Sequence, residues 1–450
     1  MKPWSTSGSR SSSRRRCWSR ANRAALPVRF NDLSRPGLRV CSRRSGRLPL
    51  LVAAALAGVG TNSEGPLLVA LARQAVIVGG GPAGDAVAAG LRDVGFDGGI
   101  TLVGAEPNPP YERPHLSKGY LTGTVKRERL PLRPAAQYRE LGVELVPGQR
   151  VVELGLERRS VELENGATIA WDCLCIATGS DARRLPALED ALYLRELPQA
   201  EQLRGLIERR EPLDIIGAGF IGCEVAAVAV QKGCAVTVHE ALEQPLLRVL
   251  GSELGGYLAG VHRTHGVDLR TSVASTPRPE GNLLVAVGSV PRTQSGLRLD
   301  GGIVVDEFGR TSAPDVYAAG DVTKHFSPLF ETHIRVEHFQ TAQRQGFAVG
   351  RAMAGGTEPY SEIPWFWSDQ YDLNLQYAGA GLAWDETVIR GALGAPPFSV
   401  FYLRGGRPIA VAGVNDHHTV ARARRLMGER KRVSAQQLAD PSFDLRRALA

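Results

Sequence analysis

Short apolar runs that end in glycine-rich turns occur twice in this chain. The first run, residues 75–78, leads into Gly-Gly-Gly-Pro-Ala-Gly at 79–84 and then into an Ala-rich stretch. The second run, residues 213–216, leads into Gly-Ala-Gly-Phe-Ile-Gly at 217–222. Runs of this length bounded by glycine indicate buried strands of a parallel sheet, and the stretches that follow indicate helices packed on it. The pattern therefore predicts two units of strand, turn and helix.

Three glycines of the first turn each have a physical role in binding a dinucleotide. Gly79 permits the tight turn, Gly81 lets the backbone approach a pyrophosphate, and Gly84 lets helix and strand pack closely. The N-terminus of the helix offers N–H groups and a positive dipole to phosphate. A further apolar run, 100–103, ends near Glu106, which could bind a ribose hydroxyl.

The second turn, with Gly217, Gly219 and Gly222, is followed by an apolar run that ends at Glu240. An acid there would hydrogen-bond a ribose 2′-hydroxyl and repel a 2′-phosphate, which favours NADH over NADPH. A glycine-rich turn without a ligand is the alternative for either motif alone. Two copies 138 residues apart, each in its strand and helix context, argue against it.

Later segments return to the first unit. Apolar runs at 173–176 and 316–319 are followed by further candidate residues, which are Ala177, Thr178, Gly179, Gly320 and Asp321. A Gly-Asp pair at a strand end can place a carboxylate against a ribityl or phosphate group, although an ordinary turn is the alternative. We therefore expect a basic leader at 1–73, a first nucleotide domain at 74–189 and 293–358, a second one inserted at 190–292, and a C-terminal domain at 359–450.

Charge is distributed unevenly along the 450 residues, whose net charge is +8. Residues 1–49 carry 13 Lys and Arg and one acid, so the remainder is net negative. We therefore expect no nucleic-acid partner. The apolar stretch 48–60 is shorter than the roughly 20 residues that span a bilayer, so we expect no membrane partner. The leader resembles a twin-arginine export signal or a transit peptide; the alternative is that it is disordered or not native, the start site having been assigned too far upstream.

The six cysteines form no Cys-x-x-Cys motif, and buried reduced thiols are expected rather than a disulfide framework. No metal site is predicted, because His262 with His265, and His417 with His418, lack further clustered ligands.

Four segments carry a resemblance to a known family. They are Pro-Tyr-Glu-Arg-Pro-His-Leu-Ser-Lys at 110–118, Tyr-Leu-Arg at 193–195, residues 217–224, and Pro-Trp-Phe-Trp-Ser-Asp-Gln-Tyr at 364–371. With these motifs the chain resembles FAD-dependent pyridine nucleotide-disulfide oxidoreductases of the ferredoxin reductase type. The family includes putidaredoxin and rhodocoxin reductases and the reductases of ring-hydroxylating dioxygenases. The resemblance implies an α/β fold of two Rossmann-like domains, the NAD domain inserted in the FAD domain, plus an α+β C-terminal domain.

The resemblance also implies roles for individual residues. Glu224 would lie beside the nicotinamide and Trp367 beside the flavin. The residues implied to contact FAD are Gly79, Gly81, Ala83, Gly84, Arg113, Lys118, Val151, Arg195, Asp321 and Phe339.

Several of these roles agree with elementary chemistry. A cation at Lys118 would favour the anionic reduced flavin, whereas a solvated surface lysine is the alternative. Trp365 and Trp367 would share one face of a strand, with one of them serving as core packing. His338 could move protons at the flavin, although a buried, hydrogen-bonded histidine is the expected state.

Disulfide reductases of this fold need cysteines beside the flavin, but the corresponding stretch here reads His-Leu-Ser-Lys at 115–118. We therefore predict a cytoplasmic NADH:ferredoxin reductase, passing hydride from NADH to FAD and single electrons to a [2Fe-2S] ferredoxin that serves a P450 or ring-hydroxylating oxygenase. The alternatives are a rubredoxin reductase, an NADH oxidase, and a non-catalytic flavoprotein, which either resembles apoptosis-inducing factor or is a decayed member that holds FAD but not NADH.

One part of the family pattern is missing. The family fold requires a meander of short strands after the apolar run 267–270, but only residues 271–282 precede the run 283–288. These twelve residues contain no alternating apolar pattern. A smaller shortening follows Thr293, and Ala105 stands where relatives often carry an acid. We therefore expect a shortened NADH domain that is less stable or altered in affinity.

Overall fold

The first nucleotide-binding unit forms a parallel five-stranded sheet in the order β15-β7-β1-β2-β3. The structure is a computed structural model that describes residues 74–449 apart from 187, 274–280 and 294–295. The strands are β1 (Gln74–Val78), β2 (Gly99–Gly104), β3 (Val143–Pro147), β7 (Cys173–Ile176) and β15 (Val316–Ala318). Because β15 follows the second unit in the chain, this domain is discontinuous in sequence, as expected.

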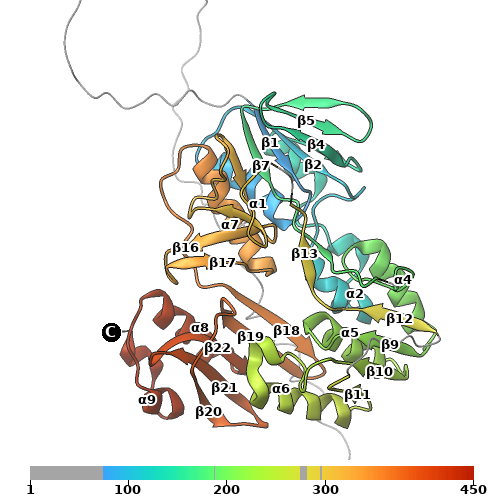
Figure 1. The fold of residues 1–450 in the computed structure, drawn as a ribbon, viewed down its shortest axis with the longest axis vertical. Coiled ribbons are helices and arrows are strands. Elements are labelled where there is room, and N and C mark those ends of the chain that lie inside the picture. The colour runs from blue at the N-terminus through green and yellow to red at the C-terminus, as the bar shows by residue number, and fades with distance from the viewer. Residues whose placement is uncertain (1–73, 187, 274–280, 294–295, 450) are drawn as a thin grey trace, which may run out of the picture. The chain divides into compact units, whose positions relative to one another are not determined.

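Both faces of this sheet are covered, which explains why β1 is buried along almost its whole length. Helices α1 (Pro82–Asp93) and α7 (Phe339–Met353) pack on one face (Figure 1). The other face packs against β4 (Val151–Gly155), β5 (Ser160–Leu163), β6 (Thr168–Ala170) and β14 (Ile303–Val305), and β14 forms a three-stranded sheet with β16 (Thr323–Ser327) and β17 (Thr332–Ile334). The remaining short elements before the second unit are η3 (Arg113–Ser117), α2 (Gly119–Thr122), η4 (Arg127–Arg129) and α3 (Ala135–Glu140).

The second unit forms a parallel four-stranded sheet in the order β11-β10-β9-β12. Its strands are β9 (Leu213–Ile216), β10 (Val236–His239), β11 (Asp268–Arg270) and β12 (Asn282–Val285), with helices α4 (Leu197–Glu208), α5 (Phe220–Gln231) and α6 (Leu247–Thr264). A two-stranded link, β8 (Ser180–Ala182) with β13 (Ser289–Pro291), joins this unit to the first.

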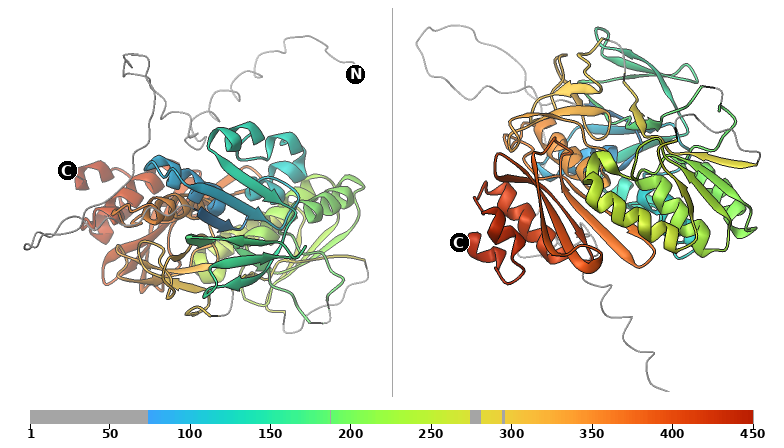
Figure 2. Two further views of the ribbon diagram at one scale, coloured as in Figure 1. Left: turned by 90° about the horizontal axis from the view of Figure 1, so that it is seen from above. Right: turned by 60° about the horizontal axis from the view of Figure 1, so that its bottom comes forward.

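The C-terminal domain is an antiparallel sheet in the order β18-β19-β22-β21-β20 with helices on one face. Its elements are β18 (Trp365–Gln370), β19 (Leu373–Gly379), β20 (Glu386–Ala392), β21 (Ala395–Arg404), β22 (Arg407–Val414), α8 (His417–Gly428), α9 (Ala435–Ala439) and η5 (Leu445–Ala448). The sheet lies beside α6 (Figure 2), and the Tyr402 hydroxyl donates to the Leu250 carbonyl at 2.8 Å.

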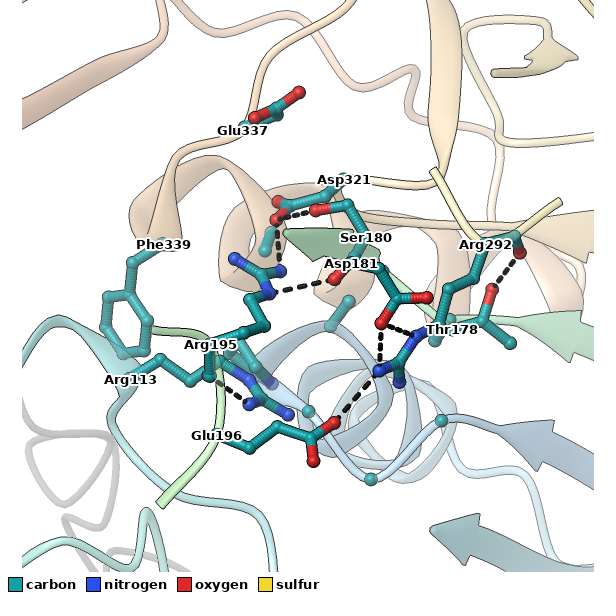
Figure 3. Close-up of a pocket in the computed structure, with 18 of the residues that line it drawn as sticks. Arg113, Thr178, Ser180, Asp181, Arg195, Glu196, Arg292, Asp321, Glu337 and Phe339 are labelled. Carbon is teal, nitrogen blue, oxygen red and sulfur yellow. Dashed lines mark hydrogen bonds and ion pairs between the residues drawn. The ribbon is translucent and has the colours of Figure 1, made fainter. Parts of the chain in front are cut away.

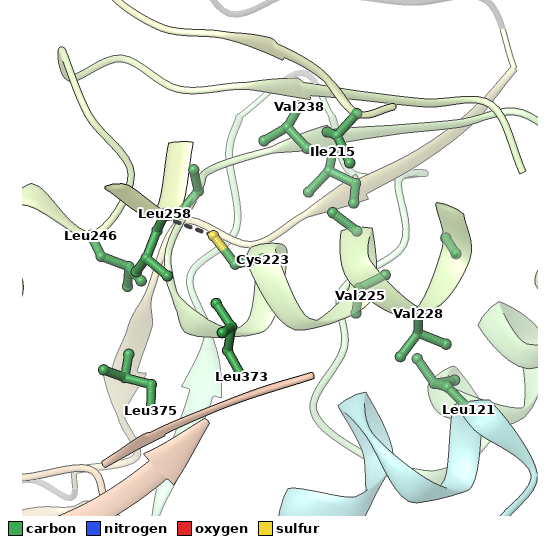
Figure 4. Close-up of a cluster of buried hydrophobic side chains, with 14 of the residues drawn as sticks. Leu121, Ile215, Cys223, Val225, Val228, Val238, Leu246, Leu258, Leu373 and Leu375 are labelled. Atoms are coloured by element: carbon green, nitrogen blue, oxygen red, sulfur yellow. Dashed lines mark hydrogen bonds between the residues drawn. The ribbon is translucent and has the colours of Figure 1, made fainter. Parts of the chain in front are cut away.

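A single apolar core joins the second unit to the C-terminal sheet. Val225 and Val228 of α5, Ile215 of β9, and Leu373 and Leu375 of β19 belong to the same buried cluster (Figure 4). The second unit is therefore stabilised by contacts that its own strands do not supply.

The shortened region differs from the sequence prediction in one boundary. The predicted strand at 283–288 ends at Val285, because the chain leaves the sheet at Ala286 and Gly288 adopts a φ of +103°. The outer edge of β12 is nevertheless paired. Leu192 N–H donates to Leu283 and its carbonyl accepts from Val285, both at 2.8 Å. Most of the connection between β11 and β12 lies outside the described residues, so the expected loss of stability stays a prediction.

The cysteines and the helices can be compared with the sequence predictions across the described residues. Among them, Cys173, Cys175, Cys223 and Cys234 are buried free thiols, as predicted, whereas Cys17 and Cys41 lie outside. The leader also lies outside the described residues. Within the described part of the chain, no helix has the length and apolar character needed to cross a membrane.

Candidate cofactor-binding site

A cavity of about 520 Å³ opens where the strands of the first sheet end. Its wall combines the 79–83 turn, the segment after β7, Asp321, the start of α7, and Phe366 and Trp367 of β18. Most residues predicted for the flavin site line this cavity. They are Gly79, Gly81, Ala83, Glu106, Arg113, Lys118, Val151, Ala177, Thr178, Gly179, Arg195, Glu224, Asp321, Phe339 and Trp367.

The glycines of the first turn differ in what surrounds them. Gly79 has a φ of +129°, and a Cβ there would lie 2.1 Å from the Ala177 carbonyl oxygen. A Cβ at Gly84 would lie 2.1 Å from the Gly79 carbonyl oxygen, so Gly84 packs behind the turn rather than in the cavity. A Cβ at Gly81 would meet nothing within 4 Å, because this position faces the open space. Gly320, also outside the lining, packs against Ala83.

One side of the cavity carries two ion-pair clusters that join distant segments (Figure 3). Arg195 Nη2 lies 2.8 Å from Asp321 Oδ2, and its Nε donates to the Ser180 carbonyl at 2.8 Å. Arg292 lies between Asp181 and Glu196, with Nη2 at 2.9 Å from the Glu196 carboxylate. Burial alone would raise the pKa of Asp181, but the hydrogen bond from Arg292 and the attraction of the surrounding arginines together lower that pKa.

Sequence reasoning missed Ser180, Asp181, Glu196 and Arg292. None of them belongs to a motif, and Arg292 is 111 residues from Asp181 in the chain.

Glu106 has partners of its own within the protein. Its Oε1 lies 2.5 Å from Arg113 Nη2, and its Oε2 accepts from the Tyr111 hydroxyl at 2.7 Å. Arg113 also donates to the Arg195 carbonyl at 2.9 Å. The predicted contact of Glu106 with a ribose therefore stays a prediction, while its observed role is to fix Arg113.

A buried Lys-Glu pair stands at the border of the two nucleotide units. Lys118 Nζ lies 2.8 Å from Glu224 Oε1, and the two side chains are 14% and 4% exposed. Glu224 also accepts from Ser117 at 2.5 Å and from Ser368 at 2.7 Å. The Lys118 ammonium lies 5.8 Å from the centre of the Trp367 ring. The structure thus brings together three residues that the sequence suggested separately, and it adds the two serines.

The second glycine-rich turn is built like the first. Gly217 has a φ of +100°, and a Cβ at Gly222 would lie 2.0 Å from the Gly217 carbonyl oxygen. Glu240 accepts from Ala218 N–H at 2.7 Å and from Leu242 N–H at 2.9 Å. Gly217, Gly219, Gly222 and Glu240 lie outside the lining of the cavity. The cavity reaches this unit at the first turn of α5, through Phe220, Ile221 and Glu224.

Comparison with known proteins decides the family. A family model described as pyridine nucleotide-disulphide oxidoreductase matches residues 73–346. The chain belongs to this family. A second model, described as reductase C-terminal, matches residues 365–449.

Relatives of this pyridine nucleotide-disulphide oxidoreductase cover most of the chain. It is 38% identical to rhodocoxin reductase of Rhodococcus erythropolis, over 83% of this chain and 94% of that protein. It is 37% identical to the ferredoxin–NAD(+) reductase component of the anthranilate 1,2-dioxygenase system of Burkholderia cepacia, over 82% and 98%.

Solved structures of similar reductases also match most of the chain. The covalent putidaredoxin reductase–putidaredoxin complex has a TM-score of 0.80 and 32% identity, over 84% of this chain and 98% of that chain. A ferredoxin reductase for the CYP199A2 system from Rhodopseudomonas palustris has a TM-score of 0.79 and 35% identity, over 84% and 100%.

The FAD that this family uses fits the cavity. The open space at Gly81 suits a pyrophosphate beside the start of α1. In addition, Nδ1 of His338, which lines the cavity, is buried without a hydrogen-bond partner in the described protein. A buried polar atom without a partner is costly, so a ligand group is expected to satisfy it.

His338 therefore corrects one sequence expectation. The residue is only partly buried, and its Nδ1 atom, although shielded from solvent, has no hydrogen-bond partner in the described protein; the ring lies against that of Phe366, with centroids 4.3 Å apart. Burial lowers the pKa of His338 to about 4, so the ring is neutral near pH 7.

Within the described residues, no cluster of His, Cys, Asp and Glu could hold a metal ion.

Proposed function

We propose that this protein is an FAD-dependent NADH:ferredoxin oxidoreductase. The observation that carries the proposal is the meeting of the FAD turn, the Lys118–Glu224 pair and the start of α5 in one cavity. Residues 74–189 and 293–358 are assigned to FAD, 190–292 to NADH, and 359–450 to the C-terminal reductase domain.

Bound FAD supplies the redox chemistry, because it accepts two electrons as a hydride and can release them singly. The chain's own residues bind and orient it. The 79–84 turn and α1 receive the pyrophosphate, while Asp321, held by Arg195, receives the ribityl or phosphate region. Lys118 places a positive charge in the cavity, which favours a negatively charged reduced cofactor. Glu224 holds that ammonium in place, and Phe220 and Ile221 offer an apolar surface to the nicotinamide half of NADH.

Cysteine positions support an external electron acceptor. No cysteine is among the described residues that line the cavity. The described thiols are buried elsewhere, and burial raises the pKa of Cys173 to about 12. A thiolate relay between flavin and substrate would require a cysteine in the cavity.

The relatives suggest what that acceptor is. Several of them are ferredoxin–NAD(+) reductase components of dioxygenase systems, and one solved relative is bound to putidaredoxin. We therefore propose a [2Fe-2S] ferredoxin that serves a P450 or an oxygenase, and a cytoplasmic location where NADH is available.

Anaerobic stopped-flow absorbance tests this proposal. Mixing the yellow holoprotein with NADH is expected to bleach the flavin band at about 450 nm, and adding a [2Fe-2S] ferredoxin should restore it. FAD that stays oxidised in NADH would overturn the reductase function. Bleaching that is reversed by oxygen but by no ferredoxin would instead support an NADH oxidase.

A further inference from the structure

A hydrogen-bonded chain of side chains runs from the Lys118–Glu224 pair through β18 and α6 to Tyr371. Ser368 Oγ lies 2.7 Å from Glu224 Oε1, and Gln370 Nε2 lies 3.2 Å from Ser368 Oγ. Gln370 Oε1 lies 3.0 Å from His262 Nε2, and His262 Nδ1 lies 2.8 Å from the Tyr371 hydroxyl. Glu224, Ser368, Gln370 and His262 are each no more than 3% exposed.

The direction of every bond in this chain follows from its chemistry. An amide oxygen only accepts, so His262 Nε2 must carry the proton that it donates to Gln370. Burial lowers the pKa of His262 to about 4, so the ring is neutral near pH 7 and Nδ1 accepts from Tyr371. The Gln370 amide donates to Ser368, whose hydroxyl proton is then directed at Glu224. All four donors therefore point toward the carboxylate.

This arrangement is more than local packing, since its members come from three separate elements. Glu224 belongs to α5, His262 to α6, and Ser368 and Gln370 to β18. The outer end is also held, because His265 stacks on Tyr371 with ring centroids 3.8 Å apart. Hydrogen bonds aligned in one direction strengthen one another in a low-dielectric interior.

We infer that Tyr371, His262, Gln370 and Ser368 form a positioning chain for Glu224. By directing a donor at Oε1, the chain fixes the carboxylate and shares its charge, so that the Lys118 ammonium remains directed into the cavity. Without Ser368, Oε1 would accept from Lys118 alone and hold the ammonium more tightly. The four residues do not line the cavity, so they act through Glu224. The inference rests on the proposed flavin site.

The flavin midpoint potential, measured by chemical reduction against a reference dye, tests this inference without NADH. Ser368→Ala should make two-electron reduction about tenfold less favourable, or about 30 mV more negative for a two-electron couple. Tyr371→Phe, which removes only the remote hydroxyl, should shift the potential in the same direction by less. In the Ser368→Ala background, Tyr371→Phe should cause no further shift of the potential, because the hydrogen-bonded connection to Glu224 is already broken.

Ser399→Ala is the matched control. Ser399 is fully buried in the same C-terminal sheet and donates to the Asp416 carboxylate at 2.8 Å. Neither residue belongs to the positioning chain. Ser399→Ala should lower the unfolding temperature much as Ser368→Ala does, while the potential stays that of the wild type.

The outcomes separate the two proposals. If Ser368→Ala lowers only the unfolding temperature, or if Tyr371→Phe has equal effects in both backgrounds, the positioning chain is overturned. A wild type that NADH does not reduce, but whose potential responds as expected, would contradict only the proposed function. A protein that cannot be loaded with FAD would overturn both.

Discussion

Glu106 and Glu240 follow equivalent strands of the two nucleotide units, yet their surroundings differ. Glu106 is engaged by two side chains, Arg113 and Tyr111. Glu240 is engaged only by backbone, through the N–H groups of Ala218 and Leu242. The carboxylate of Glu240 therefore braces the second glycine-rich turn and keeps a negative charge that no described cation pairs with.

Glu240→Ala is expected to raise the KM for NADH about tenfold, comparable to the loss of one charge-assisted hydrogen bond. It should also reduce the preference for NADH over NADPH, because the charge that repels a 2′-phosphate is gone. Steady-state kinetics with both cofactors measure this. Glu240→Gln separates the two roles, since it removes the charge but keeps one acceptor. Glu243→Ala, at an exposed position, is the control; unchanged selectivity in Glu240→Ala would refute the assignment.

At the scale of elements, the two faces of β18 contact different parts of the protein. Phe366, Ser368 and Gln370 point toward α5 and α6, whereas Trp365 and Trp367 share the opposite face. The tryptophan rings lie 6.0 Å apart. Trp367 lines the cavity, while Trp365 packs against the C-terminal helical core, with the Arg424 guanidinium 5.6 Å from its ring.

Because Trp365 lies beside the cavity-lining Trp367, we predict that the protein acceptor docks near it; Trp365→Ala is then expected to slow ferredoxin reduction several-fold while NADH-driven dye reduction stays within about twofold, since a dye needs a smaller contact surface. Parallel assays with ferredoxin and with a dye measure this. Trp384→Ala is the control, since Trp384 is a half-buried tryptophan of the same domain that packs on Tyr402. Equal loss of both activities in Trp365→Ala would assign Trp365 to core packing alone.

At the scale of the whole molecule, the sequence predicted the discontinuous fold well. The two glycine-rich turns mark strand ends by local chemistry, and the later apolar run at 316–319, which contains β15, indicated that the chain returns to the first unit after the second. The family resemblance, confirmed by the comparisons, supplied Lys118, Glu224 and Trp367 as site candidates.

The pairings between distant segments could not be predicted. Arg292 with Asp181, and His262 with Gln370, are joined only by the tertiary fold, and neither pair leaves a local pattern. The same holds for the support of the shortened NADH domain. The core of this domain continues into β19, and Leu192 pairs with the edge of β12. Both contacts come from segments outside the shortened region, so the missing meander gave no indication of them.

Three histidines with lowered pKa values make the stability of the whole molecule depend on pH. Burial lowers the pKa of His262, His325 and His338 to about 4 each, whereas the unfolded chain has histidine pKa values of about 6.5. Between pH 6.5 and pH 4 the unfolded chain therefore binds protons that the folded chain does not. The free energy of unfolding should fall as the pH falls through this window, by at most about 1.4 kcal/mol per pH unit for each histidine, and these groups should contribute no slope above it.

His325→Gln isolates one of these contributions, since His325 lies outside the cavity lining. Denaturant unfolding at several pH values should show a slope below pH 6.5 that is smaller than that of the wild type by up to one proton. His418→Gln, at an exposed position in the first turn of α8, should leave the slope unchanged. An unchanged slope in His325→Gln would mean that this histidine binds its proton equally well in the folded and the unfolded protein, which its burial within β16 against the Tyr360 ring opposes.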